Sequence, residues 1–304
     1  MSARMNVSEC RAVDLAALVP LPAADANKYT RGTLVAVVGS ERYPGAACLS
    51  AAASQRAGAG YTEVVTHPAA VELVRMWRPS LVVRPRSALP EVLESAGRGK
   101  PFAFLVGCGF DASDEESEPL VHAVLERFRG PVVVDGSGLD ALVSDGGRGL
   151  LRRRFEEGDP TVVTPHSGEA ARLARPLGLP ADDPCSLARS LALALGVVAL
   201  VKGPVTYASD GDKIVRMAHG TSALAKAGTG DVLAGMVGAL LAQGAGALDA
   251  AVLGAELHAR AGRVAAARLT DVAVIAEDVV EAVPLAIAEL LREAHEDGAE
   301  RSRR

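Results

Sequence analysis

The sequence predicts an α/β protein with a mostly parallel central sheet. Short runs of β-branched and apolar residues alternate with alanine-rich helical segments from about residue 33 to residue 207, which is the pattern of βαβ units. Several of these runs are almost wholly apolar, as strands buried on both faces must be. The hydrophobic fraction of 49% in 304 residues is ample for a large core.

The expected strands are spaced so that a helix fits between successive ones, and they are 33–38, 62–66, 81–83, 102–106, 132–134, 161–163 and 197–201. After Lys202 the pattern changes. Segments 205–208 and 213–217 flank a polar turn and predict a β-hairpin at the edge of the sheet. A helical block follows, with one helix after Asp231, a second at about 248–268 and a third at about 276–293.

The chain contains neither a Pro/Ser-rich linker nor an internal repeat, so we expect one domain over residues 26–293. Residues 1–25 lack a strong pattern and are expected to form an N-terminal extension. Residues 294–304 are charged and are expected to be a frayed C-terminal tail.

The overall charge and the cysteine spacing exclude several classes of function. A formal charge of −5 and a pI near 5.8 give no basic footprint, so we expect no nucleic-acid partner. Charged residues interrupt the N-terminus where a signal peptide needs an apolar core, and no segment approaches the ~20 apolar residues of a membrane span. We therefore expect a cytoplasmic protein without a membrane partner. The four cysteines lack zinc-binding spacing and are expected to be buried free thiols.

The motif Gly228-Thr229-Gly230-Asp231 precedes a segment, residues 232–242, that has no charged residue and favours a buried helix. At the start of such a helix, unpaired N–H groups and the macrodipole attract phosphate oxygens. A lone carboxylate beside them suits phosphoryl transfer. Acidic residues also favour helix N-termini without any chemistry, so the motif by itself leaves both interpretations open.

In an open parallel sheet, ligands bind beyond the carboxyl ends of the strands, so the loops there are the candidate site. Residues 39–47 form a small-residue turn that suits either a flat ligand or an ordinary strand-to-helix turn. Gly107 and Gly109, on either side of Cys108, permit close backbone approach. The acidic stretch 114–118 is most simply a solvated helix start.

Three further strand ends carry polar side chains whose role the sequence alone leaves open. Asp135 suits a ligand contact or a cap for the next segment. His166 suits a contact with a ligand hydroxyl or amide, or a capping role, and Glu169 fits the first turn of the helix that follows. Lys202, beside Gly203, suits a phosphate contact, although a surface lysine explains it nearly as well.

Taken together and in this order, the motifs resemble the ribokinase-like family of ADP/ATP-dependent NAD(P)H-hydrate dehydratases, related to the C-terminal domain of the bifunctional repair proteins. The resemblance covers about residues 27–292. The early and late motifs jointly separate this family from sugar and vitamin kinases of the same fold, which GTGD alone does not do. The motifs are NKYTRG at 27–32, the GS..YPGAA segment at 39–47, GCGFD at 107–111, VVVD at 132–135, TPHSGE at 164–169, KGPVT at 202–206 and AGTGDVLAG at 227–235.

The resemblance implies a three-layer α/β/α domain and a homotetramer. It also implies Asp231 as the catalytic base, Mg²⁺ as the cofactor and ADP (or ATP) as the co-substrate. The nucleotide-binding residues implied are Lys202, Gly203, Pro204, Val205, Thr206, Gly228, Thr229 and Gly230. The hydrate-binding residues implied are Ala46, Gly109, His166 and Asp231.

The chain departs from the family pattern at four places. Asn27 replaces the usual histidine before the first strand, Ser137 replaces a second aspartate after VVVD, and Ser167 replaces the usual proline of TPHPGE. The usual NPGMATGGTGD approach also reads differently here, over residues 220–231.

The activity that the resemblance implies is dehydration of the S-epimer of hydrated NADH or NADPH (NADHX or NADPHX), with release of phosphate and AMP (or ADP). The stand-alone form resembles the ADP-dependent branch. No epimerase domain is present in these residues, so an NAD(P)H-hydrate epimerase is expected as a functional partner. Two alternatives stay open. One is a ribokinase-fold kinase for a vitamin precursor or small alcohol, and the other is a non-catalytic nucleotide-sensing protein.

Overall fold

A computed structural model describes residues 7–97 and 99–301 of the chain. In this part of the chain the strands form a single ten-stranded sheet in the order β1-β10-β9-β8-β7-β6-β5-β2-β3-β4. The strands are β1 Val7–Ser8, β2 Thr33–Val37, β3 Tyr61–Thr66, β4 Val82–Pro85, β5 Phe102–Val106, β6 Val132–Val134, β7 Thr161–Val163, β8 Val198–Val201, β9 Thr206–Ser209 and β10 Ile214–Met217.

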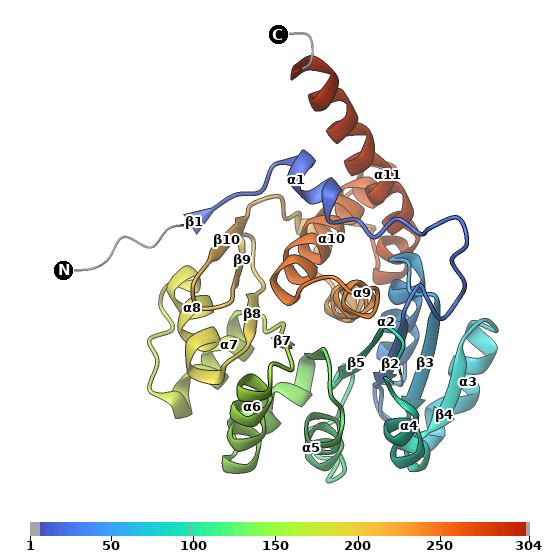
Figure 1. The fold of residues 1–304 in the computed structure, drawn as a ribbon, viewed down its shortest axis with the longest axis vertical. Helices are drawn as coiled ribbons and strands as arrows, with labels where there is room; N and C mark the ends of the chain where they lie inside the picture. Colours follow the sequence, from blue (N-terminus) through green and yellow to red (C-terminus); the bar gives the residue numbers. More distant parts are fainter. Residues whose placement is uncertain (1–6, 98, 302–304) are drawn as a thin grey trace.

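Helices cover both faces of this sheet (Figure 1). The α-helices are α1 Ala12–Ala17, α2 Gly45–Arg56, α3 Val71–Trp77, α4 Leu89–Ser95, α5 Ser117–Arg127, α6 Asp145–Glu157, α7 Ser167–Ala174, α8 Pro184–Leu195, α9 Thr229–Ala242, α10 Ala247–Leu269 and α11 Ala276–Arg301. Two 3₁₀ segments matter for the site, η3 Gly136–Val143 and η5 Ser222–Leu224.

Strands β2 to β8 pair in parallel, whereas β9 pairs antiparallel with both β8 and β10. The α/β class and the mostly parallel sheet predicted from the sequence are therefore confirmed, as are the hairpin after Lys202 and every expected strand to within one or two residues. From β2 the chain continues to β3 and β4 on one side. It then crosses to β5 and continues to β8 on the other. The strand order thus reverses between β2 and β5, and such switch points place ligands beyond the strand ends.

Two separate apolar layers hold the sheet between its helices. One layer packs the sheet against α2, α9, α10 and α11, and the other packs it against α4 to α8 (Figure 1). Consecutive strand residues point to opposite faces, so β2 sends Leu34 and Ala36 into the first layer and Val35 and Val37 into the second. All four side chains are fully buried, which accounts for the unbroken apolar runs in the sequence.

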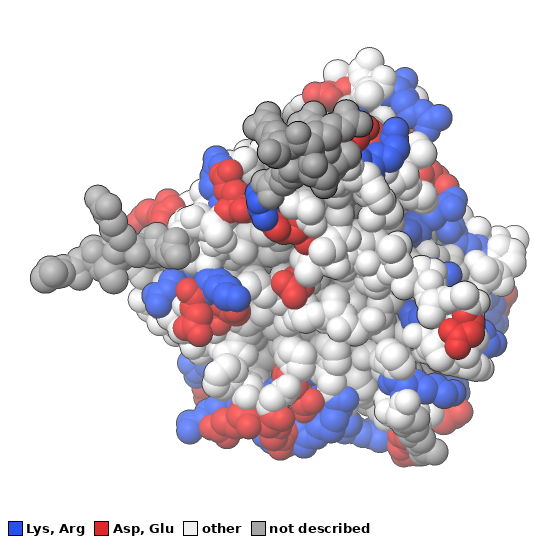
Figure 2. Space-filling view, turned by 45° about the horizontal axis from the view of Figure 1, so that its top comes forward, with Lys and Arg blue, Asp and Glu red and all other residues white. Residues whose placement is uncertain are grey.

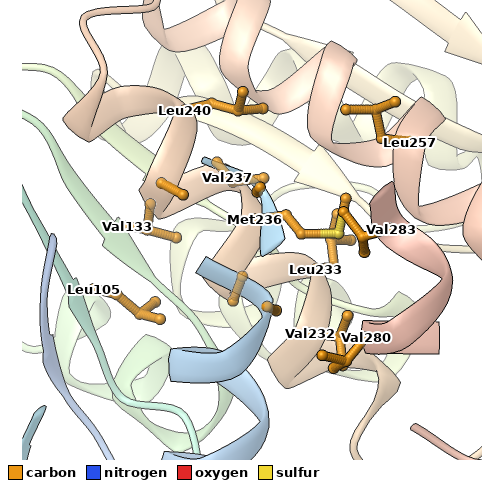
Figure 3. Packing of buried hydrophobic residues seen from close by; sticks show 14 of the residues in the cluster. Leu105, Val133, Val232, Leu233, Met236, Val237, Leu240, Leu257, Val280 and Val283 are labelled. Atoms are coloured by element: carbon orange, nitrogen blue, oxygen red, sulfur yellow. The ribbon is translucent and has the colours of Figure 1, made fainter. Parts of the chain in front are cut away.

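Helix α9 is buried on nearly all sides, which agrees with its lack of charged side chains. Figure 3 shows Met236, Leu233 and Val232 beside Val280 and Val283 of α11, with Leu105 of the sheet on the opposite side. A Cβ atom on Gly235 would lie 2.1 Å from the carbonyl oxygen of Ser50 in α2, so glycine is required for this close helix contact. Burial on every side fixes the position of the motif at the N-terminus of α9.

The two ends of the described chain differ from the sequence-based expectation. Strand β1 pairs in parallel with β10 and so covers the edge at which the hairpin was expected, while Leu15 of α1 is buried in the first layer. Helix α11 continues to Arg301, so the prediction of a frayed segment from residue 294 is wrong for residues 294–301. Ala, Glu and Arg are good helix formers, and they extend the helix even where it projects from the body (Figure 1). Residues 1–6 and 302–304 lie outside the described residues.

Candidate active site

The residues singled out from the sequence gather at the carboxyl ends of the parallel strands. The loops after β2 and β5 lie side by side at the switch point, where the Gly39 amide donates to the Cys108 carbonyl at 2.8 Å. Gly109 has a φ of +65°, and a Cβ atom there would lie 2.4 Å from the Ala46 Cβ. Ala46 and Gly109, both predicted to contact the hydrate, are thus in direct contact. The close backbone approach expected of this glycine is confirmed.

Gly228 begins α9 with a φ of +89°, and a Cβ atom there would lie 2.6 Å from the Leu49 side chain. The turn is closed by Thr229, whose hydroxyl donates to the carbonyls of Leu224 and Lys226 at 2.8 and 2.9 Å. The next residue, Gly230, would bring a Cβ atom within 3.4 Å of the Lys202 ammonium. Lys202 therefore lies directly at the start of α9, where the first backbone N–H groups have no partner within the helix.

A part-buried ion pair links the end of β6 to the end of β8. The Oδ1 atom of Asp135 accepts hydrogen bonds from the Lys202 ammonium at 2.8 Å and from the Thr164 hydroxyl at 2.7 Å. The Asp135 side chain does not cap η3, although it stands at the capping position. The Lys202 side chain is only 18% exposed, so the interpretation of Lys202 as a surface lysine is wrong.

Lys202 stays charged in this setting. Burial disfavours the ammonium, but the carboxylates of Asp135 and Glu169 outweigh that effect and raise the pKa of Lys202 above its usual value. The charge is therefore available to interact with an anionic group that approaches the start of α9.

Asp231 completes the cluster. Burial and the nearby carboxylate of Asp135 raise the pKa of Asp231 to about 7, against the opposing influence of Lys202 and of a hydrogen bond from Cys108. Ligand atoms of Cys108, Asp135 and Asp231 all lie within 4.8 Å of one another. A carboxyl group with a pKa near neutrality, held beside an ammonium in a partly exposed site, is suited to accept a proton.

His166 caps helix α7. Its Nδ1 atom accepts hydrogen bonds from the amides of Gly168 and Glu169 at 3.0 and 3.3 Å, and the Glu169 carboxylate accepts from the His166 amide. The imidazole side chain is 57% exposed, and its Nε2 atom lies 3.4 Å from the Glu169 carboxylate. The capping interpretation of His166 is therefore confirmed, and the exposed ring leaves a ligand contact possible as well. The His166 backbone also forms a parallel bridge with Lys202.

The predicted nucleotide loop, residues 203–206, lies beside the segment that leads into α9. The Gly203 amide donates to the Thr206 hydroxyl at 3.4 Å, and a Cβ atom on Gly220 would lie 2.8 Å from the Pro204 carbonyl. Gly203 and Pro204 are exposed, while Val205 and Thr206 are half-buried. The two segments together form an open rim next to Lys202.

The sequence analysis missed the role of two residues close to the candidate site, His258 and Thr164. His258 in α10 is buried, and its Nε2 atom has no hydrogen-bond partner among the described residues. Burial and the charge of Lys202 lower the pKa of His258 to about 4, although a backbone hydrogen bond to Thr229 opposes this, so the ring is neutral. Thr164, which positions Asp135, was read only as part of its motif. No periodicity marks either residue.

The interpretation of the acidic stretch 114–118 as simply a solvated helix start is wrong for Asp114, which pairs with Arg86. The guanidinium of Arg86 is buried, contacts Asp114 at 2.5 Å and donates to the Gly39 carbonyl at 3.0 Å. It also lies 5.3 Å from the centre of the Phe110 ring. Arg86 therefore joins the loops after β2 and β5, the two loops that carry the predicted hydrate contacts.

Asn27, one of the departures from the family pattern, accepts hydrogen bonds from the amides of Tyr29 and Thr30 and forms the turn before β2.

The distribution of charge on the described surface agrees with the sequence, which has no basic footprint. On the face that Figure 2 shows, basic and acidic side chains are interspersed. Among the described residues, no helix is both long and apolar enough to cross a membrane. All four cysteines are free, and three of them are buried.

Comparison with known proteins gives a consistent result. Residues 34–285 match the family model described as NAD(P)H-hydrate dehydratase. A bifunctional NAD(P)H-hydrate repair enzyme of Mycobacterium leprae is 37% identical over 266 residues, covering 84% of this chain and 50% of the relative. The chain thus spans about half the length of such bifunctional relatives. An ADP-dependent (S)-NAD(P)H-hydrate dehydratase of Xanthomonas campestris is 30% identical, covering 92% of this chain and 97% of the relative.

Solved structures show the same fold. An ADP/ATP-dependent NAD(P)H-hydrate dehydratase of Bacillus subtilis, co-crystallised with ATP/Mg²⁺, matches with a TM-score of 0.78 and 24% identity over 94% of this chain and 99% of that one. A ribokinase-like superfamily protein of Enterococcus faecalis matches with a TM-score of 0.79 and 22% identity over 93% and 96% of the two chains. The fold is therefore ribokinase-like. Since the family model covers most of the chain and includes the whole cluster around Asp231, this protein belongs to the NAD(P)H-hydrate dehydratase family.

Proposed function

We propose that this chain dehydrates the S-epimer of hydrated NADH or NADPH with ADP as the phosphoryl donor, releasing AMP and phosphate, and that ATP is the alternative donor. The observation that carries the proposal is the cluster of Asp231, Asp135 and Lys202 at the start of α9, which joins a base with a pKa near 7 to a buried ammonium. The family membership and the names of the relatives support the substrate class.

Asp231 is the proposed catalytic base. Hydroxide is a poor leaving group, so the hydroxyl on the nicotinamide-derived ring is first phosphorylated. Asp231 accepts the hydroxyl proton as the oxygen attacks the terminal phosphorus of the nucleotide and the bond to the departing nucleotide breaks. Electron donation from the ring nitrogen then breaks the C–O bond and expels phosphate, and loss of a proton from the adjacent ring carbon restores the dihydronicotinamide.

The remaining predicted residues bind and orient the two substrates. Lys202, residues 203–206 and the amides of Gly228, Thr229 and Gly230 are proposed to hold the nucleotide phosphates. Ala46, Gly109 and His166 are proposed to contact the hydrate together with Asp231. The direct contact between Ala46 and Gly109, and the separate proximity of Lys202 to Gly230 at the start of α9, support this division.

Mg²⁺ prefers oxygen ligands, and the Asp135 carboxylate suits it: Lys202 and Thr164 donate to its Oδ1 atom, while its Oδ2 atom faces the Cys108 thiol at 3.7 Å. When bound, Mg²⁺ would neutralise charge on the nucleotide phosphates. The sulfur of Cys108 is a poor ligand for this hard cation.

The proposal includes a homotetramer, a cytoplasmic location and a separate epimerase as functional partner. The exposed side chains of Leu73, Met76 and Trp77 share one face of α3, which supports contact with another subunit. The bifunctional relatives, which are about twice as long, support partnership with an epimerase. Light scattering on the purified protein tests the assembly.

Product analysis tests the proposed reaction. The S-hydrate is incubated with ADP and with ATP in parallel, while the dihydronicotinamide absorbance and the release of inorganic phosphate are followed. Recovery of the chromophore with one phosphate per turnover supports the dehydratase. A stable phosphorylated product identifies a kinase instead, and absence of nucleotide consumption in the presence of hydrate identifies a non-catalytic nucleotide-sensing protein.

A further inference from the structure

Cys108 places a soft metal ligand inside the cluster that holds the proposed base. Its side chain is fully buried, and its Sγ atom lies 3.7 Å from Oδ2 of Asp135. A carboxylate oxygen of Asp231 completes a set of three ligand atoms that are all within 4.8 Å of one another. The three residues come from the loop after β5, the end of β6 and the first turn of α9, so they are held by three separate elements.

We propose that Cys108, Asp135 and Asp231 form an inhibitory site for a thiophilic divalent cation such as Zn²⁺ or Cd²⁺. Tetrahedral Zn²⁺ with Zn–S of about 2.3 Å and Zn–O of about 2.0–2.2 Å separates its ligand atoms by roughly 3.3–3.8 Å. The 3.7 Å between Cys108 and Asp135 already fits this range. The third ligand needs to move by no more than about 1 Å, given the 4.8 Å limit on the set.

The neighbouring ammonium does not block this site. Lys202 and Thr164 both donate to Oδ1 of Asp135, whereas the oxygen facing Cys108 is Oδ2. Lys202 can therefore keep its bond while Oδ2 binds the cation. The thiol proton of Cys108 passes to solvent when the Zn–S or Cd–S bond forms. Two carboxylates and a thiolate then give three protein ligands, and the fourth position stays open.

Metal binding here would stop the proposed reaction, because it occupies the carboxylate of Asp231 that accepts the proton. The sulfur sets the selectivity. Hard cations such as Mg²⁺ and Ca²⁺ prefer oxygen ligands, whereas Zn²⁺ and Cd²⁺ bind thiolates tightly. Inhibition by Zn²⁺ is therefore expected in the presence of excess Mg²⁺. This consequence rests on the proposed function, but the metal site itself does not.

Direct binding is measured by titrating the metal-free protein with Cd²⁺ and following the ultraviolet thiolate-to-cadmium charge-transfer band. The test variant is Cys108→Ser, which keeps a hydroxyl near Asp135 but removes the soft ligand. The matched control is Cys10→Ser, because Cys10 is half-buried and lies outside the set of Cys108, Asp135 and Asp231. We expect the tight phase of the titration to weaken by roughly tenfold or more in Cys108→Ser and to stay in Cys10→Ser. Loss of that phase in Cys10→Ser and its retention in Cys108→Ser would overturn the proposal.

The second readout is inhibition at buffered free Zn²⁺ with Mg²⁺ in excess, expressed for each variant relative to its own metal-free rate. Equal sensitivity of wild type and Cys108→Ser contradicts the proposal. If Cys108→Ser does not fold, Asp231→Asn replaces it in the Cd²⁺ titration, where unchanged affinity is the contrary result. The metal site and the proposed function can fail separately. If the charge-transfer band depends on Cys108 but the protein does not dehydrate the hydrate, the metal site is supported and the proposed function is contradicted.

Discussion

Arg154 is a buried ionisable group and Asp231 a half-buried one; they lie beyond opposite ends of the parallel strands and differ in how their charge is satisfied. Arg154 is fully buried and donates to the carbonyls of Phe128, Gly130 and Pro160 and to the Thr161 hydroxyl, just before β6 and β7 begin. Burial lowers its pKa to about 10, so the guanidinium stays charged at neutral pH. Asp231, beyond the ends of the same strands, has a pKa of about 7.

The difference lies in how many polar partners each group has. Arg154 directs its donors to the carbonyls of Phe128 and Gly130 and to the Thr161 hydroxyl, at the beginning of two strands, so its hydrogen bonds stabilise the fold. Asp231 shares a small space with Asp135 and Cys108, and its ionisation is opposed by burial. A buried charge with saturated partners is typical of structure, whereas one with competing neighbours is typical of a catalytic site.

The largest expected effect is on turnover by Asp231→Asn. Asparagine keeps the shape and removes the proton acceptor, and general-base assistance is worth about 10² to 10⁴ in rate. We expect kcat to fall by that factor while the protein folds and binds ADP normally. Steady-state kinetics with the S-hydrate and calorimetry with ADP measure the two quantities. Turnover within a few-fold of wild type in the folded variant would remove Asp231 from the catalytic role.

Arg154→Leu is the opposite test at the other end of the sheet. It removes the guanidinium donor from the carbonyls of Phe128 and Gly130 and from the Thr161 hydroxyl, so we expect the free energy of unfolding to fall by about 3–5 kcal/mol. The fraction that remains folded should keep the wild-type kcat, because Arg154 lies away from the cluster. Urea unfolding and activity per folded molecule test this. A fall in kcat at full folding would contradict the division between a structural and a catalytic region.

These two regions also differ in how far the sequence predicts them. The strands, the mostly parallel sheet and the position of Asp231 follow from local patterns, because neighbouring residues in the sequence determine which strands are buried and where helices start. The Asp135–Lys202 pair joins residues 67 positions apart, and Arg86 reaches Asp114 across 28. Such contacts depend on strand order, which no local pattern specifies. Helix α11 extends past the expected boundary for a related reason, since a charged segment is compatible with either helix or coil.

Lys202→Ala should mainly weaken nucleotide binding. A hydrogen bond to a charged group is worth about 1.5–3 kcal/mol, which corresponds to a loss of affinity of about 10- to 150-fold for ADP. The KM for the hydrate should change less, because Lys202 lies next to Gly230, which is a proposed nucleotide contact and not a hydrate contact. Calorimetric titration with ADP measures the affinity. Unchanged affinity would mean that the Lys202–Asp135 pair serves the fold, as Arg154 does.

The pH dependence should show the raised pKa of Asp231 directly. The base must be ionised to accept a proton, so kcat/KM for the hydrate should rise about tenfold between pH 6 and pH 8 and level off above pH 8. A profile without an inflection between pH 6 and pH 8 would contradict this assignment.

Stability gives the control for the same group, with the sign fixed by linkage. The folded pKa of about 7 exceeds the ordinary aspartate value of 3.8, so the folded state binds the proton more tightly and Asp231 costs stability as the pH rises from about 4 to 7. Asp231→Asn should therefore have a higher Tm than wild type at pH 8. The difference should disappear near pH 4. A variant that is less stable than wild type at pH 8 would place Asp231 with Arg154 among the structural charges.

The smallest expected effect is at His166, which combines both kinds of role in one side chain. Its Nδ1 atom caps α7, and its ring is exposed toward solvent. His166→Ala should raise the KM for the hydrate about three- to tenfold, the loss of roughly one hydrogen bond, with ADP affinity near wild type. Loss of the cap should also cost about 1 kcal/mol of stability. His166→Asn keeps a capping side chain, so it should regain the stability and keep the raised KM. If Asn restores the KM as well, the effect of His166 passes through the helix cap, and the hydrate is bound without the imidazole.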